Sequence, residues 1–352
     1  ELTSQFQPQG NFKPTGGKPR MVHVLHRGDI QSPRQPAVPG TLPVVPGTPP
    51  QFELPEGHAE GDSRAALAKW ITREDNPLTW RSIVNRIWHY HMGRGIVASP
   101  NDVERMRQLP SHPAFLDWLA IEFRDNGQSI KSLHRMIVTS TVYRQASSFG
   151  ENADEASIAM IELARKLDAG NVNLWRMNRR RLEAEEIRDA VLAVSGSLRY
   201  QMGGPGFYLF KLERTAHSPH FEYHKFDPAD TASHRRSIYR FIARSQPDPF
   251  MTTLDCADSS QSTPRRNETM TSLQALTLLN NQFNLTMAAR FAERLGVESD
   301  SLDHQINLAM RRVVGRAPTP EELDGLRTYG AKYGLSNLCR LLFNLSEFVY
   351  ID

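Results

Sequence analysis

Proline is concentrated at the start of this chain, where residues 1–62 contain 11 of its 23 prolines. Proline fixes φ and lacks the backbone N–H, so this density excludes helices from the segment. We therefore expect residues 1–62 to form an extended, proline-rich strap. Within it, the run Met21-Val22-His23-Val24-Leu25 is β-like and predicts one strand, which we expect to join a small sheet.

Helical patterns take over after the strap. Apolar spacing and terminal residues predict helices at 63–71, 77–92, 182–194 and 273–295, one that opens at Pro113, and a break near Asn280-Asn281. The spacing of apolar residues changes from helical to alternating around residues 200–245, where Phe207–Phe210 and Ser237–Ile242 resemble strands. Residues 254–271 form a long polar loop, a kind of segment that is often functional. The predicted fold class is mainly α with a small antiparallel β-sheet (α+β), and residues 63–352 form one mainly helical domain.

Charge and hydropathy exclude two classes of partner. The formal net charge is only +3, and acidic and basic residues alternate without a basic tail, so we expect no nucleic-acid partner. No run of eighteen apolar residues occurs, so we expect no membrane span. The first residues, Glu1-Leu2-Thr3, contain neither an initiator Met nor a signal peptide, and we expect the sequence to begin inside a longer or processed chain.

Arginine dominates the cations, since only 8 of the 42 Lys and Arg residues are Lys. Four arginines stand directly before the predicted 182–194 helix: Arg176, Arg179, Arg180 and Arg181. Cations at a helix N-terminus oppose its dipole, so negative groups should compensate them. The candidates are acids in the first turn of the helix, Asp255 or Asp258 in the polar loop, and a bound anion. An internal ion-pair network and a ligand site both remain open.

Candidate site residues follow from this cluster. Arg265 and Arg266 of the polar loop join the four arginines as candidates for binding an anionic substrate. Asp255, Asp258, His134 and Glu183 are the candidates for acid–base chemistry. A deep pocket that joined Asp255, Asp258, Arg180 and His134 would favour an enzyme, whereas a flat apolar patch would favour a packing module.

Metal and cofactor sites receive little support. His220, Glu222 and His224 alternate, so on a strand they would share one face and could bind zinc or iron, but the turn residues around them favour a plain surface loop. Cys256 and Cys339 are the chain's two cysteines, which excludes covalent haem attachment within this segment. Whether they pair stays open. We expect no cofactor in this segment.

Several strings, taken together and in order, resemble one known family. They are Asn76-Pro77-Leu78-Thr79, Asn85-Arg86-Ile87-Trp88, Gly93-Arg94-Gly95-Ile96-Val97, Ser111-His112-Pro113, Leu116-Asp117-Trp118-Leu119-Ala120, Leu133-His134-Arg135-Met136-Ile137-Val138, Tyr143-Arg144-Gln145, Arg176-Met177-Asn178-Arg179-Arg180-Arg181-Leu182-Glu183-Ala184-Glu185, Asp248-Pro249-Phe250, Arg265-Arg266 and Leu273-Gln274-Ala275-Leu276. The chain resembles the planctomycete-type domain of unknown function of family 1553, also called the PSD-type domain. The likeness runs from about Arg20 to the end of the chain.

The resemblance implies a setting more than a reaction. Members of this family typically follow a sister domain of unknown function, often behind a cytochrome-c-like domain, in exported proteins. It therefore implies an upstream sister domain and a haem-bearing domain as partners, and an extracytoplasmic location, periplasmic or secreted. Two functions remain: an enzyme module acting on anionic or carbohydrate substrates such as an anionic glycan, and a non-catalytic module that packs against the upstream domains.

Overall fold

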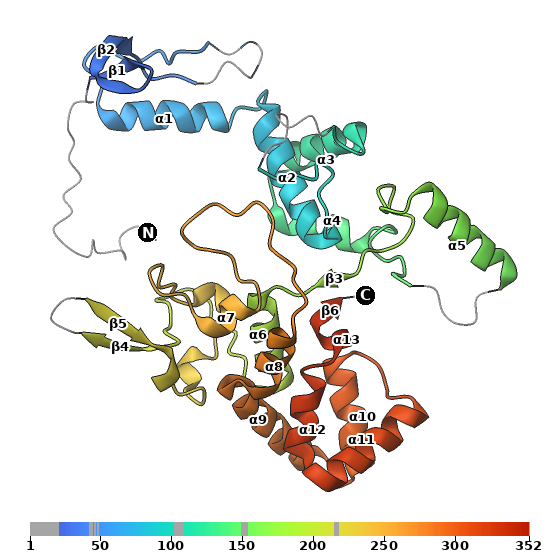
Figure 1. Cartoon of the computed structure of the whole chain (residues 1–352). Coiled ribbons are helices and arrows are strands. Elements are labelled where there is room, and N and C mark those ends of the chain that lie inside the picture. The colour runs from blue at the N-terminus through green and yellow to red at the C-terminus, as the bar shows by residue number, and fades with distance from the viewer. Residues whose placement is uncertain are drawn as a thin grey trace. The chain divides into compact units, whose positions relative to one another are not determined.

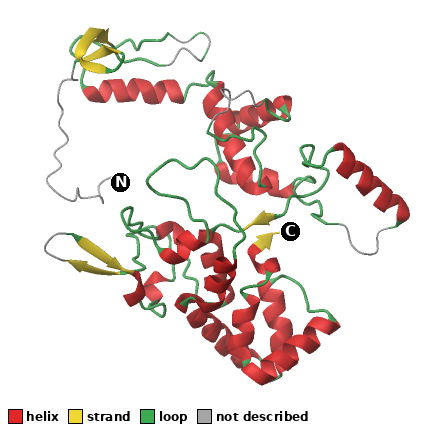
Figure 2. Ribbon diagram, in the orientation of Figure 1, coloured by secondary structure: helices red, strands yellow, loops and turns green. Residues whose placement is uncertain are grey.

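The computed structural model describes residues 21–41, 45, 47, 49–101, 109–148, 154–214 and 218–351. Within these residues the chain is mainly helical, and its strands form three separate two-stranded antiparallel sheets (Figures 1 and 2). The predicted fold class is therefore confirmed. The chain divides into two compact units, residues 1–90 with 94–137 and residues 91–93 with 138–352. The predicted boundary between strap and helical domain, at residue 62, stays a prediction.

The strap contains a hairpin. Strand β1 (Val22–His26) pairs with β2 (Asp29–Ala37) across a tight turn in which Arg27 and Gly28 both have positive φ, at 52° and 80°. Two such residues make the turn type that suits the twist of a hairpin. The structure has a strand where the run near Met21 predicts one, but it pairs with a second strand of the strap, β2, which the sequence did not predict. Two prolines obscured β2, and both are tolerated because every strand of a hairpin is an edge.

Four helices follow in the first unit: α1 (Glu60–Ile71), α2 (Pro77–Met92), α3 (Pro113–Asp125) and α4 (Ile130–Thr139); the last two residues of α2 and of α4 fall in the second unit. Aromatic side chains join α2 to α3. The ring centroids of Trp80 and Phe123 lie 6.5 Å apart, and those of Trp88 and Phe115 lie 5.1 Å apart, edge to face. Burying such rings stabilises the contact between the two helices.

The second unit has the larger core. It contains α5 (Glu155–Leu167), β3 (Arg180–Arg181), α6 (Ala184–Val194), β4 (Lys211–Arg214), β5 (Pro219–Glu222), α7 (Pro249–Thr253), α8 (Ser272–Asn280), α9 (Gln282–Glu298), α10 (Leu302–Val313), α11 (Pro320–Tyr333), α12 (Leu335–Leu342), α13 (Ser346–Val349) and β6 (Tyr350–Ile351). Its core is built from α6, α9, α10 and α12 through fully buried residues such as Ile187, Phe291, Ile306 and Leu338. The Phe291 and Phe343 rings stack at 6.0 Å. Cys339 lies in this core, and both it and Cys256 are free thiols.

The predicted strands at 207–210 and 237–242 were wrong. Residues Ser237–Tyr239 form a 3-10 turn, and Phe207 makes only an isolated parallel bridge to Arg240. The polar–apolar alternation of residues 237–242 predicted a strand with its apolar side chains buried, but here the polar residue Ser237 is buried. Asp189 Oδ1 accepts from both the backbone N–H and the hydroxyl of Ser237 at 2.7 Å. The neighbouring Ile238 is 77% exposed instead.

Candidate functional site

Arg181 fastens the polar loop to the strand before α6. Its Nη1 donates to Asp255 Oδ2 at 2.8 Å and to the Thr269 carbonyl at 2.9 Å. The two charged side chains are 5% and 15% exposed, so the pair is largely shielded from water. One guanidinium therefore holds both ends of the loop segment 255–269 against β3. This contact joins two of the candidate residues that lie 74 positions apart in the chain.

The carboxylate of Asp255 is fully occupied by internal donors. Besides Arg181, it accepts from the Thr269 backbone N–H, the Thr269 hydroxyl and the Gln274 amide, each at 2.9 Å. Burial acts to raise the pKa of Asp255, but the hydrogen bonds from Thr269, Arg181 and Gln274 outweigh it and hold the pKa below its usual range. An ionised carboxylate so bound serves as an anchor, and it is a poor proton acceptor for catalysis.

A second cluster lies where α6 begins. Arg266 Nη2 contacts Glu185 Oε1 at 3.2 Å and Glu183 Oε2 at 3.5 Å. The thiol of Cys256 donates to Glu185 Oε1 at 3.3 Å, and Arg240 Nη2 donates to that sulfur at 3.6 Å. We call Glu183, Glu185, Cys256 and Arg266 the acid–thiol cluster. It brings Glu183 and Arg266, both predicted site residues, into contact.

The two glutamates of this cluster differ in proton affinity. Burial, reinforced by Glu186 and Glu185 and opposed by Arg266, raises the pKa of Glu183. Burial also acts to raise the pKa of Glu185, but Arg266, a backbone hydrogen bond and the Cys256 thiol outweigh it and lower that pKa. Burial and the Glu185 charge raise the pKa of Cys256, so this sulfur is a neutral thiol. Among the described residues, Glu185 Oε2 and Arg266 Nη1 are buried without a hydrogen-bond partner.

The other candidate arginines take separate roles. Arg180 donates to both oxygens of Glu186, at 2.9 and 3.3 Å, so an acid in the first turn of α6 compensates it. Arg176 donates to the Met177 carbonyl and lies over the Trp175 ring, 5.3 Å from its centroid. Arg179 and Arg265 are exposed. The structure therefore does not gather the six arginines around one anion.

Asp258 and His134 lie apart from these contacts. Asp258 is exposed and closes a local turn by accepting from the Ser260 backbone N–H at 2.8 Å and from Gln261 at 3.4 Å. His134 is an exposed residue of α4, in the first unit, whereas the other acid–base candidates belong to the second. The candidate set thus reduces, by direct contact, to Arg181 with Asp255 and Arg266 with Glu183.

His220, Glu222 and His224 do not lie on one strand, which is the arrangement that a shared metal face would require. β5 ends at Glu222, and Tyr223–Lys225 form a 3-10 turn. His224 Nδ1 contacts Glu222 Oε2 at 3.2 Å. In the described part of the chain, no group of three or more His, Cys, Asp or Glu side chains is placed to hold a metal ion.

Sequence reasoning missed Cys256 and Glu185 as cluster members, and Arg240 as a donor to the Cys256 sulfur. Cys256 carried one signal, its position next to Asp255 in the polar loop, but a lone cysteine in a loop does not indicate its neighbours. Glu185 stood among several acids of the same helix, and only the position of Arg266 distinguishes it.

Comparison with known proteins identifies a family. The PSD1 family, described as a protein of unknown function (DUF1553), matches residues 63–329, and the chain therefore belongs to it. No curated protein and no solved structure matches. None of the helices in the described residues is long and apolar enough to cross a membrane.

Proposed function

We propose that this chain is a non-catalytic docking module that packs, through helix α5, against an upstream sister domain of the kind that the family resemblance implies. The observation that carries the proposal is the apolar stripe of α5. Met160, Leu163 and Leu167 follow one another at i, i+3 and i+7 and therefore share a face. They are 70%, 54% and 78% exposed.

Helix α5 has strong local signals but, among the described residues, contributes none to the buried core. Asp154 caps it by accepting from the Ser157 backbone N–H at 2.8 Å, and Arg165 and Lys166 complement the dipole in its last turn. None of its residues is buried. Isolated helices shorter than about 12–15 residues are marginal in water, and most take their stability from packing of an apolar face. A partner surface over Met160, Leu163 and Leu167 would supply that packing.

The charged groups support the same function. Two of the candidate arginines form ion pairs inside the unit: Arg181 pairs with Asp255, and Arg180 pairs with Glu186. Arginines that form ion pairs within the unit stabilise its fold. They leave fewer cations to bind an anionic glycan. The haem-bearing upstream domain and the extracytoplasmic location remain proposals that rest on the family resemblance.

Leu163→Glu tests the docking face. In the full-length protein, the charge should lower the free energy of unfolding by about 2 kcal/mol, the value of one buried leucine, and should speed amide exchange in α5. In this chain alone it should change stability by less than about 0.5 kcal/mol, because an exposed side chain loses no contact. Denaturant titration and hydrogen-exchange mass spectrometry measure both quantities.

Ile158→Glu is the matched control. Ile158 is 47% exposed on the same helix, but lies about 140° around the axis from Leu163. Ile158→Glu should leave the free energy of unfolding unchanged both in the full-length protein and in this chain alone. Two results would refute the docking face. One is an equal loss of stability for the two variants in the full-length protein. The other is amide exchange in α5 that is as fast in the full-length protein as in this chain alone.

Acid–base catalysis is the second candidate, favoured by the opposite pKa shifts of Glu183 and Glu185. Environments that separate two carboxyl pKa values are how enzymes assign an acid and a base. Carbon-13 titration of the side-chain carboxyls should show Glu183 titrating above, and Glu185 below, the usual value of about 4.3. Two glutamates that titrate together near that value would end the catalytic hypothesis for this cluster.

The same shifts set the pH dependence of stability. Because the folded pKa of Glu183 is raised, its contribution is present below the unfolded pKa and is lost as pH rises through the folded pKa. For Glu185 the folded pKa is lowered, so its contribution is present above the unfolded pKa and is lost as pH falls through the folded pKa.

A further inference from the structure

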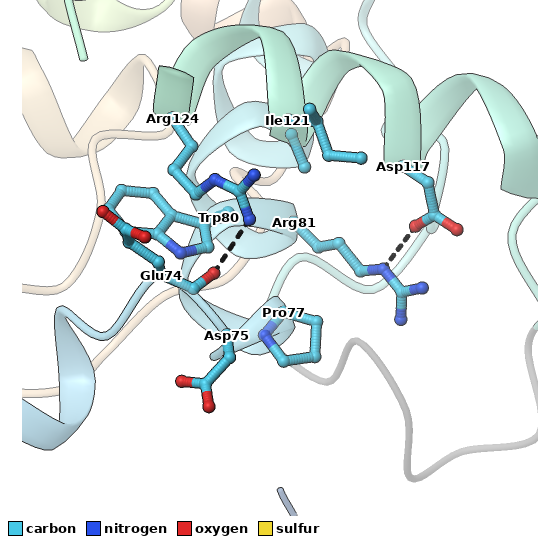
Figure 3. A pocket seen from close by; sticks show the side chains of 9 residues that line it. Glu74, Asp75, Pro77, Trp80, Arg81, Asp117, Ile121 and Arg124 are labelled. Atoms are coloured by element: carbon cyan, nitrogen blue, oxygen red, sulfur yellow. Dashed lines mark hydrogen bonds and ion pairs between the residues drawn. The ribbon is translucent and has the colours of Figure 1, made fainter. Parts of the chain in front are cut away.

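A pocket in the first unit has charges that are already paired. It has a volume of about 280 Å³ and lies between α2 and α3 (Figure 3). The acidic side chains of Glu74 and Asp117 lie at its opposite ends, with the Arg124 and Arg81 guanidinium groups between them. Arg81 pairs with Asp117 at 2.6 Å, and Arg124 pairs with Asp125 at 2.6 Å. The pocket therefore favours no particular ligand charge.

A buried histidine of the second unit has a more demanding environment. His234 is 1% exposed and ends the turns of residues 228–234, which we call the 228–234 segment. Arginines outside this segment donate to its carbonyl groups: Arg188 to Ser233 at 2.6 Å, Arg199 to Thr231 at 3.3 Å and Arg290 to Ala229 at 2.9 Å. Guanidinium groups thus hold the segment against α6 and α9.

The hydrogen bonds of His234 fix its protonation state. Its Nε2 lies 2.9 Å from the Pro228 carbonyl oxygen, and its Nδ1 lies 3.3 Å from Arg290 Nη1. A carbonyl oxygen can only accept and a guanidinium can only donate, so Nε2 carries the proton and Nδ1 is the acceptor. The imidazole is therefore neutral in this arrangement.

A proton on Nδ1 of His234 is incompatible with the contact to α9. It would point an N–H group at the Arg290 N–H, so the hydrogen bond between the two side chains would be lost. It would also place a second positive charge beside a guanidinium that stays charged at every relevant pH. The contact between His234 and Arg290 therefore exists only while the imidazole is neutral.

The charged groups around His234 favour the neutral form. Burial lowers the pKa of His234, and Arg290 of α9 and Arg188 of α6 add to this effect, whereas the Pro228 hydrogen bond and Asp230 oppose it. Because the folded pKa is lowered, the contribution of His234 to stability is present above the unfolded pKa of about 6.5. It is lost as pH falls through the folded pKa.

We propose that His234 is an acid-sensitive latch, which holds the 228–234 segment on α9 while its imidazole is neutral and releases the segment when Nδ1 is protonated. Release removes two acceptors of Arg290, the His234 ring and the Ala229 carbonyl. Arg188 still holds the α6 side through the Ser233 and Arg235 carbonyls, so the opening is local. The inference goes beyond the docking role of α5 and does not depend on it.

Amide exchange of this whole chain, measured by mass spectrometry against pH, tests the latch. After correction for the intrinsic effect of pH on exchange, opening of residues 229–234 should rise by up to about tenfold for each unit that pH falls below about 6.5, because opening takes up one proton. Helix α9 should remain protected at the acid end of this range, where the segment is open. Loss of protection in both together would show global unfolding and overturn the latch.

Two variants remove the titration and each keep one hydrogen bond. His234→Asn can still accept from Arg290, and His234→Gln can still donate to the Pro228 carbonyl. In both, opening of the segment should no longer depend on pH, whatever the change in overall stability. His304→Gln is the matched control, because it removes an exposed imidazole from α10 and should keep the wild-type dependence. A dependence that survives in both His234 variants would overturn the latch.

Nitrogen-15 NMR of histidine-labelled protein tests the wild type directly. At neutral pH His234 should show the tautomer protonated at Nε2, and it should titrate below the reference value of about 6.5. Arg290→Met, which removes the facing cation, should raise its titration midpoint. A proton on Nδ1 at neutral pH, or a midpoint that does not move in Arg290→Met, would contradict the proposal even if the His234 variants fail to fold.

Discussion

Arg181→Ala should lower the free energy of unfolding by about 3 kcal/mol, because it leaves a shielded carboxylate without its cation. Asp255 keeps the Thr269 and Gln274 donors, but these are neutral groups. The loop segment also loses the hydrogen bond from Arg181 to the Thr269 carbonyl. Urea denaturation of wild type and variant measures the loss.

Arg180→Ala is the control on the neighbouring residue. Its partner Glu186 is 42% exposed, so solvent screens the pair and we expect a loss of about 1 kcal/mol or less. Similar losses for the two arginines would contradict the distinction between an anchored loop and a surface pair.

Acid should remove the Asp255 contribution selectively. The folded pKa of Asp255 is lowered, so its stabilising contribution is present above the unfolded pKa, about 3.9, and is lost as pH falls through the folded pKa. Arg181→Ala should therefore show a shallower decline between neutral and acid pH than wild type.

Helices were predictable from sequence because their signals are local. Pro77 at the start and Gly93 after the end bound α2 as expected, since proline suits a first helical turn and glycine the left-handed stop, where φ is 72°. Residues 254–271 were likewise recognised as a loop. The break after Asn280 is also local, because Asn281 caps α9 through the Phe283 backbone N–H.

The candidate site was predictable only in part, because its contacts are distant in sequence. Composition located the arginine cluster and the acidic loop, and the contact between them is confirmed. Which arginine reaches Asp255 depends on strand geometry: successive side chains of β3 point to opposite sides, so Arg181 is buried while Arg180 turns toward Glu186. Pairing of β3 with β6, the last strand of the chain, fixes that orientation, and no local pattern encodes it.

Arg188 illustrates a signal that was present in the sequence but was not used. Ala184, Ile187, Val191 and Leu192 form the buried stripe of α6, and Arg188 lies within the same stripe by helical spacing. An arginine in that position requires acceptors from another segment. The turns at 231–239 supply them.

Arg188→Ala should be the most damaging of the arginine substitutions, with a loss of about 3–5 kcal/mol. The side chain is 1% exposed, its Nη2 donates to the Ser233 carbonyl at 2.6 Å, and its Nη1 donates to the Arg235 carbonyl at 3.1 Å and the Ser237 hydroxyl at 3.3 Å. Its guanidinium also lies over the Phe207 and Phe283 rings, at 5.0 and 5.3 Å from their centroids. The variant loses these contacts and leaves a cavity.

The charge of Arg188 persists at neutral pH. Burial lowers the pKa of Arg188 to about 10, with Asp189 and Asp248 opposing the change. Arg188→Lys therefore preserves a cation but should recover little stability, because one ammonium cannot reach the acceptors that the planar fork reaches together. Arg199→Ala is the matched control, since exposed Arg199 also donates to a carbonyl of this segment, that of Thr231 at 3.3 Å, and its loss should stay below about 1 kcal/mol. Full rescue by lysine would show that charge alone, without the directed hydrogen bonds, holds the 231–239 turns onto α6.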